Sequence, residues 1–71
     1  MPNLCPEPSE LAALRPLSAS QVQATITNCG LAGATDLDTY NAWKAKFNIL
    51  PPPPTGGFQP NLVSWIAANY I

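Results

Sequence analysis

The stretch LSASQVQATITNCGL, residues 17–31, contains both the start and the end of one helix. Ser18 is a good N-cap, and Gln21 stands three residues later, as a capping box requires. Leu17 and Val22 flank the cap at positions where their side chains can pack together. The pattern therefore predicts a helix that begins directly after Ser18.

The second half of the stretch predicts where this helix ends. Val22, Ile26 and Cys29 recur at helical spacing and form one apolar stripe. Gly30 can adopt the left-handed conformation that ends many helices, and Leu31 can then fold back onto Ile26. Because start, apolar face and end agree, this helix is the best specified element of the chain.

Upstream of this stretch, proline residues mark a shorter helix. Pro8 suits a first helical turn, Glu10 is favourable near the N-terminal end, and Pro16 stops the helix. We expect residues 1–7 to form an extended arm before it.

Downstream, the pattern predicts a third helix that ends near residue 47. Thr35 or Asp36 can cap its N-terminus. Lys44 and Lys46 stand in the last turns, where positive charge suits the helix dipole. Its apolar residues share one face: Leu37, Tyr40, Trp43 and Phe47. Of these we expect Tyr40, Trp43 and Phe47 to be core. Together with the two preceding helices it would form a helical body over residues 8–50.

The last third of the chain has no charged side chain after Lys46. Pro51 to Pro54 predict a stiff polyproline II segment of about 12 Å, at ~3.1 Å per residue. The Thr55–Gly57 segment then allows a turn, so residues 51–60 read as a polyproline and glycine spacer. We expect a final helix over residues 61–71, with Pro60 in its first turn and Phe58 packed on Val63.

This C-terminal helix is apolar around most of its circumference, which is unusual for so small a protein. A chain of this length can hardly enclose one helix on all sides, so part of its surface is expected to meet a protein partner. The predicted contacts are Leu62, Trp65, Ile66 and Tyr70. The plainer alternative is that these residues close the core of the chain itself.

The patterns together predict an all-α fold, a single small domain of three to four short helices. The extended arm precedes the helical body, and the polyproline spacer comes before the C-terminal helix. A domain of 71 residues is marginally stable alone and often needs a disulfide, a metal or a partner subunit.

Composition argues against several classes of function. Three basic residues cannot form a basic patch for nucleic acid. No apolar run approaches the roughly 18 residues of a membrane span. The chain has no histidine and only two cysteines, so zinc ligation, cysteine catalysis and other cofactor sites are not expected. We expect neither enzymatic activity nor a small-molecule substrate.

Cys5 and Cys29 allow two interpretations. In one, a disulfide ties the N-terminal arm to the second helix and closes a loop of about 25 residues, which would stabilise the fold by roughly 3 kcal/mol. In the other, Cys5 is free and Cys29 is a small buried hydrophobe. The N-terminus lacks the basic start and apolar core of a signal peptide, so we expect synthesis in the cytoplasm, where disulfides are disfavoured.

Three functions remain open. The leading hypothesis is a non-enzymatic structural or assembly protein, a small subunit that docks into a larger complex or lattice or self-associates. An accessory component of a virus or phage particle, such as a cement, neck or tail protein, fits this profile and would place the chain in a virion. The alternatives are a small secreted helical effector or inhibitor held by Cys5–Cys29, and an adaptor module of a multiprotein system.

Overall fold

The computed structural model describes residues 5–71, and its regular elements are four helices. These are α1 (Pro8–Ala13), α2 (Ala19–Cys29), α3 (Asp36–Phe47) and α4 (Leu62–Asn69). No strand occurs within residues 5–71, so the predicted all-α class is confirmed. Residues 1–4 of the predicted arm lie outside the described part.

Helix α2 begins and ends as its sequence predicts. The Ser18 Oγ accepts a hydrogen bond from the Gln21 N–H at 3.2 Å, and the Gln21 side chain accepts one from the Ser18 N–H at 2.8 Å. At the other end Gly30 is left-handed, with φ 65° and ψ 38°, and the Leu31 N–H donates to the Ile26 carbonyl at 2.9 Å. Both caps are thus confirmed, and they fix the length of α2.

Helix α3 starts after Thr35, whose Oγ1 accepts a hydrogen bond from the Asp38 N–H at 3.2 Å. Three of the four residues predicted for its apolar face are buried, namely Tyr40, Trp43 and Phe47. These three were predicted to be core, and the fourth residue of the face, Leu37, is 49% exposed. Thr39 is buried in the first turns of α3 instead, because its hydroxyl accepts a hydrogen bond from the Gly33 N–H at 2.8 Å in the preceding connection.

Helix α4 starts later than predicted. Asn61 is its N-cap, and the Asn61 Oδ1 accepts a hydrogen bond from the Ser64 N–H at 2.9 Å. Pro60 therefore precedes the cap, after a cis peptide bond, and is not in the first helical turn. The predicted register, with Phe58 just before the cap and Val63 at the fourth helical position, is wrong for the same reason, because the cap lies two residues further on.

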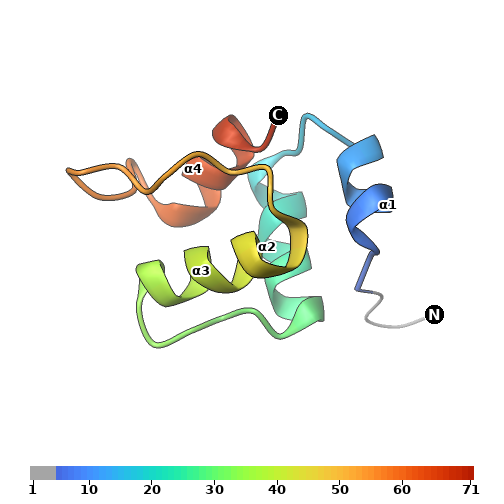
Figure 1. The fold of residues 1–71 in the computed structure, drawn as a ribbon, viewed down its shortest axis with the longest axis horizontal. Coiled ribbons are helices and arrows are strands. Elements are labelled where there is room, and N and C mark those ends of the chain that lie inside the picture. The colour runs from blue at the N-terminus through green and yellow to red at the C-terminus, as the bar shows by residue number, and fades with distance from the viewer. Residues whose placement is uncertain (1–4) are drawn as a thin grey trace.

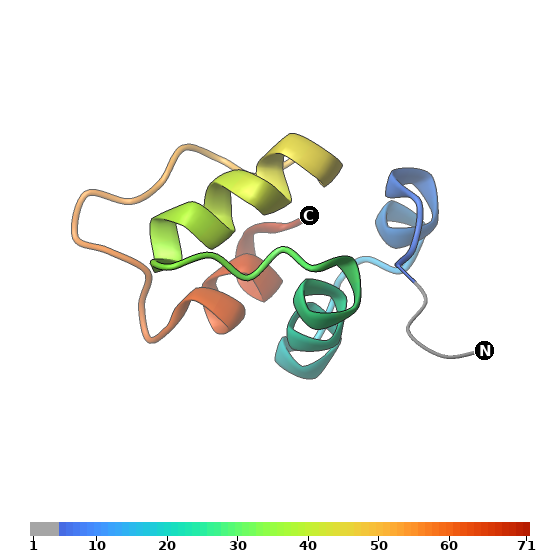
Figure 2. The same cartoon turned by 90° about the horizontal axis from the view of Figure 1, so that it is seen from below.

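The helices pack in two pairs, α2 against α4 and α1 against α3. Figures 1 and 2 show α1 at one end of the long axis and the loop before α4 at the opposite end. The Cα radius of gyration is 11.2 Å, close to the ~11 Å expected of a compact chain of this length. Eleven apolar side chains form one buried cluster: Leu11, Leu17, Val22, Ile26, Tyr40, Trp43, Phe47, Leu50, Leu62, Ile66 and Tyr70.

Candidate interaction surface

The four predicted partner contacts on the C-terminal helix divide into two groups. Leu62, Ile66 and Tyr70 belong to the core, and the last two have no exposed surface. A partner could reach them only if α4 left α2, so their role as partner contacts stays a prediction that this conformation does not support. Trp65 is different because it is only half-buried. The plainer alternative, that these residues close the core, describes three of the four.

Trp65 belongs to an aromatic cluster with Phe58 and Tyr40. The Trp65 ring lies 5.0 Å from the Phe58 ring and 5.8 Å from the Tyr40 ring, both in edge-to-face arrangements. The Phe58 and Tyr40 rings are 5.6 Å apart. Tyr40 is buried, whereas Phe58 and Trp65 keep part of their surface in solvent. We call these three residues the aromatic cluster; edge-to-face pairs of this kind stabilise by about 0.5–1.5 kcal/mol each.

The proline segment is attached to this cluster through Tyr40. The Tyr40 hydroxyl donates a hydrogen bond of 2.6 Å to the Pro51 carbonyl oxygen. Pro51 and Pro54 are half-buried while Pro52 and Pro53 are exposed, the three-residue spacing of a polyproline II helix. The predicted spacer is therefore fastened to the body at its first residue, and its outer face consists of proline rings.

A tight reversal of the backbone after α3 makes this attachment possible. Asn48 and Ile49 have positive φ values of 59° and 72°. Asn48 combines its φ with a ψ of -151°, a region open to little but glycine, and a β-branched isoleucine adopts a positive φ only at a cost. The reversal carries Leu50 into the core, where it is 5% exposed, and brings Pro51 to Tyr40.

A second pair of aromatic residues, Trp43 and Tyr70, is enclosed in the core. Their rings meet edge to face at 5.5 Å, and neither side chain is exposed. The Trp43 Nε1 and the Tyr70 hydroxyl have no hydrogen-bond partner within residues 5–71. Burial raises the pKa of the Tyr70 hydroxyl above its usual 10.0, and the Arg15 guanidinium opposes this shift. The sequence pattern predicted that Trp43 is core, but nothing in it signalled the unpaired polar atoms.

A groove of about 550 Å³ runs between α2 and the N-terminal ends of α3 and α4. Apolar Ile26, Leu62 and Val63 line it beside the polar Gln23 and Thr39. Asp36 is the one charged residue in its lining. The hydroxyl-bearing residues of the lining are Thr39 and Ser64.

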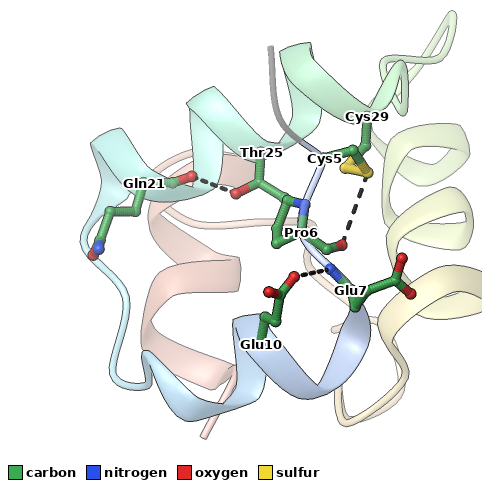
Figure 3. The surroundings of a disulfide bond; sticks show 7 residues. All are labelled: Cys5, Pro6, Glu7, Glu10, Gln21, Thr25 and Cys29. Carbon is green, nitrogen blue, oxygen red and sulfur yellow. Dashed lines mark hydrogen bonds between the residues drawn. A yellow bond between two sulfur atoms is a disulfide. The ribbon is translucent and has the colours of Figure 1, made fainter. Parts of the chain in front are cut away.

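Cys5 and Cys29 are joined by a disulfide, with the Cα atoms 4.8 Å apart (Figure 3). Cys29 is the last residue of α2, while Cys5 lies in the non-helical segment before α1. The bond therefore connects the end of the best specified helix to the beginning of the chain. Figure 3 also marks the approach of the Cys5 sulfur to the Pro6 carbonyl oxygen at 3.9 Å. A bonded sulfur carries no proton, so this is a contact and not a hydrogen bond.

The remaining ionisable groups do not gather into a further site. Within residues 5–71, no three histidine, cysteine or acidic side chains lie where they could hold a metal ion. Glu10 accepts a hydrogen bond from the Glu7 N–H at 2.9 Å and thereby caps α1. In the same residues, none of the helices has both the length and the apolar character needed to cross a bilayer.

Phe58 is the surface residue that sequence reasoning missed as part of this site. The predicted register placed it across the helix cap, where it would have packed on Val63 alone. Its contacts with Tyr40 and Trp65 depend on how the spacer folds back, which no local pattern records. No protein-family model, curated protein or solved structure matches the chain. A function must therefore be argued from these residues alone.

Proposed function

We propose that the chain is a non-enzymatic binding and assembly protein, which docks onto a protein partner or onto copies of itself. The observation that carries this proposal is the aromatic cluster, with Phe58 and Trp65 half-exposed beside the proline segment. Tryptophan and tyrosine are enriched among the residues that dominate binding energies. The cluster provides a rigid apolar contact on the surface of the folded chain.

The surroundings of the cluster support the same proposal. No charged side chain occurs after Lys46, so Phe58, Trp65 and the exposed Pro52 and Pro53 lie in an uncharged part of the sequence. The charge beside the cluster is the Lys44 ammonium, which lies 3.5 Å from the Tyr40 hydroxyl. The centre of a protein interface is depleted of charge and enriched in aromatic residues. Soluble domains of this size normally keep roughly a quarter of their surface charged.

The setting of this assembly is a further part of the proposal. A small subunit with so little charge could dock into a lattice, such as that of a virus or phage particle. Its role there would be that of a cement, neck or tail component. That assignment depends on composition alone.

Light scattering across a concentration series tests the proposal. We expect the apparent mass to rise above the 7.5 kDa of one chain as concentration increases. The substitutions Phe58→Gln and Trp65→Gln should weaken the association, because each removes an aromatic contact from the proposed surface. A circular dichroism melt of each variant verifies that it is folded.

Leu37→Gln is the matched control. Leu37 is an exposed apolar residue on α3 outside the aromatic cluster, so this variant should associate like the unaltered chain. If the chain is monomeric at high concentration, while α4 is protected from hydrogen exchange, docking onto copies of itself is wrong and the proposal is reduced to a different protein partner. Equal weakening by Leu37→Gln would also contradict it, because the association would then be non-specific.

A second candidate function is supported by the Cys5–Cys29 bond. We propose as the alternative a small secreted helical effector or inhibitor, because stable disulfides are typical of proteins that work outside reducing compartments. Intact mass spectrometry of protein from its native source distinguishes the two. A mass that rises by about two daltons on reduction, which is the gain of two hydrogens, favours the secreted protein. A mass that does not change favours a cytoplasmic assembly component.

A further inference from the structure

The disulfide lies where a dissolved thiol can reach it. Cys5 is exposed and Cys29 is half-buried, and the bond lies on the outside of α2 beside the start of α1 (Figure 3). A thiolate in solution can attack the Cys5 sulfur while the core remains closed. Access of this kind is a property of disulfides that undergo exchange under native conditions.

Helix α1 has little else to hold it in place. It has six residues, whereas isolated helices shorter than about 12–15 residues are marginal even in favourable sequences. Leu11 is its one buried side chain, and the next residues, Leu14 and Arg15, are exposed. The other ten members of the buried cluster lie outside α1. The body of the protein can therefore remain folded without α1, but α1 cannot remain helical without the body.

Helix α1 and Arg15 just after it lie against α3 and against the Tyr70 ring, the two parts of the structure that form the buried pair Trp43 and Tyr70. The helix packs against α3, which carries Trp43. The Arg15 guanidinium lies 5.9 Å from the centre of the Tyr70 ring. The Trp43 Nε1 and the Tyr70 hydroxyl have no partner within residues 5–71, so both polar atoms would gain hydrogen bonds to water if this cover opened.

We propose that Cys5–Cys29 is a redox latch, which holds α1 over Trp43 and Tyr70 when oxidised and releases it when a thiol reduces the bond. Reduction frees residues 5–16 from α2, and α1 unfolds because it is too short to stand alone. Helices α2, α3 and α4 stay folded, and the apolar surface beneath α1 becomes available. The latch is independent of the function proposed above.

The chemistry needs only a thiol reductant. The first thiolate attacks the Cys5 sulfur, the sulfur–sulfur bond breaks, and the electron pair leaves on the Cys29 sulfur, which takes a proton. A second thiolate attacks the outer sulfur of the mixed disulfide and releases the Cys5 sulfur, which is also protonated. Two electrons and two protons pass to the protein, and two thiols become one disulfide.

Nuclear magnetic resonance before and after reduction with dithiothreitol tests the latch. We expect the Cα chemical shifts of Pro8–Ala13 to collapse to random-coil values, while those of α2, α3 and α4 remain helical. The indole N–H of Trp43 should exchange with solvent at least about tenfold faster after reduction, because its cover is gone. The Cys5→Ser, Cys29→Ser double variant should match the reduced protein and should not respond to dithiothreitol.

Two results would overturn the latch. If α1 keeps its helical shifts after reduction, the disulfide is not what holds it. If all four helices are lost together, the bond stabilises the whole fold and there is no separate opening. Should the double variant fail to fold, reduction of the already folded protein still decides between these outcomes.

Discussion

Helices α1 and α4 are both short, yet different interactions hold them. Helix α4 has eight residues, and Leu62, Ile66 and the adjoining Tyr70 are buried in the core. Helix α1 has six residues and contributes Leu11 alone. Its second attachment is covalent, through the disulfide just before it.

The difference shows how a small chain can keep two helices that neither length nor propensity would stabilise. Burying a large apolar side chain stabilises by about 1.5–3 kcal/mol, so α4 gains several times what α1 gains. For α1 the disulfide compensates by limiting how far the segment can move away. One helix is thus part of the core, and the other is attached to its surface.

Truncating the chain at either end should give the largest difference in stability between the α1 and α4 regions. A chain of residues 1–50 lacks Leu62, Ile66 and Tyr70, a loss of roughly 5–9 kcal/mol that is comparable with the whole stability of a small domain. We expect it to be unfolded. A chain of residues 17–71 loses only Leu11 from the buried cluster and should keep its helices.

Far-UV circular dichroism of the two truncated chains, with thermal melts, checks this prediction. The chain of residues 17–71 serves as the control for truncation itself. A folded and soluble chain of residues 1–50 would show that α4 is not core, and would restore Leu62, Ile66 and Tyr70 as partner contacts.

Single substitutions should repeat the contrast on a smaller scale. Ile66→Ala leaves a cavity in a core that cannot open locally, so we expect it to lower the free energy of unfolding by about 2–5 kcal/mol. Leu11→Ala should cost no more than about 2 kcal/mol, because α1 can open once its anchor is weakened. Urea denaturation of both variants measures the difference. Equal losses would place α1 in the same cooperative unit as α4.

The reversal after α3 can be tested with Ile49→Asn. Ile49 is 38% exposed and has a φ of 72°, so asparagine should relieve more backbone strain than it loses in packing. We expect a gain in stability of about 1 kcal/mol, measured by urea denaturation. Leu14→Asn is a control for the loss of an exposed apolar side chain, since Leu14 has an ordinary φ of -88°. A comparable gain in the control would show that strain is not the cause.

Tyr70 lies where the two regions meet, and its hydroxyl should give the smallest effect. Because burial raises its pKa in the folded state, the unfolded chain releases this proton first as pH rises. The contribution of Tyr70 to the free energy of unfolding should therefore be constant below pH 10 and should fall above it. Tyr70→Phe should remove that part of the fall. Urea denaturation at several alkaline pH values compares the two proteins, and parallel curves would contradict the prediction.

The parts of the fold that could be predicted are those determined by residues close together in the sequence. The caps of α2 follow from Ser18, Gln21 and Gly30, because each makes its hydrogen bonds within its own helix end. Asn61 as the cap of α4 was missed because Pro60 beside it offered a competing signal. The exposure of Leu37 could not be predicted, since it depends on how the connection before α3 crosses the first turn.

The candidate site was predicted less well than the fold. Trp65 was named as an interface residue, and it is the one of the four named residues that remains half-exposed. Its neighbours Phe58 and Tyr40 come together only because the spacer turns back and Pro51 bonds to the Tyr40 hydroxyl. Contacts between segments so far apart in the chain leave no periodic pattern.

Native-state hydrogen exchange of the oxidised protein, in a series of low urea concentrations, tests the contrast between α1 and α4 most directly. We expect the amides of Leu11 and Leu14 to exchange through a local opening that urea hardly accelerates. The amides of Trp65 and Tyr70, which make the hydrogen bonds at the two ends of α4, should exchange only through global unfolding and respond steeply to urea. If α4 exchanges by the same shallow opening as α1, it is not part of the core and the account is wrong.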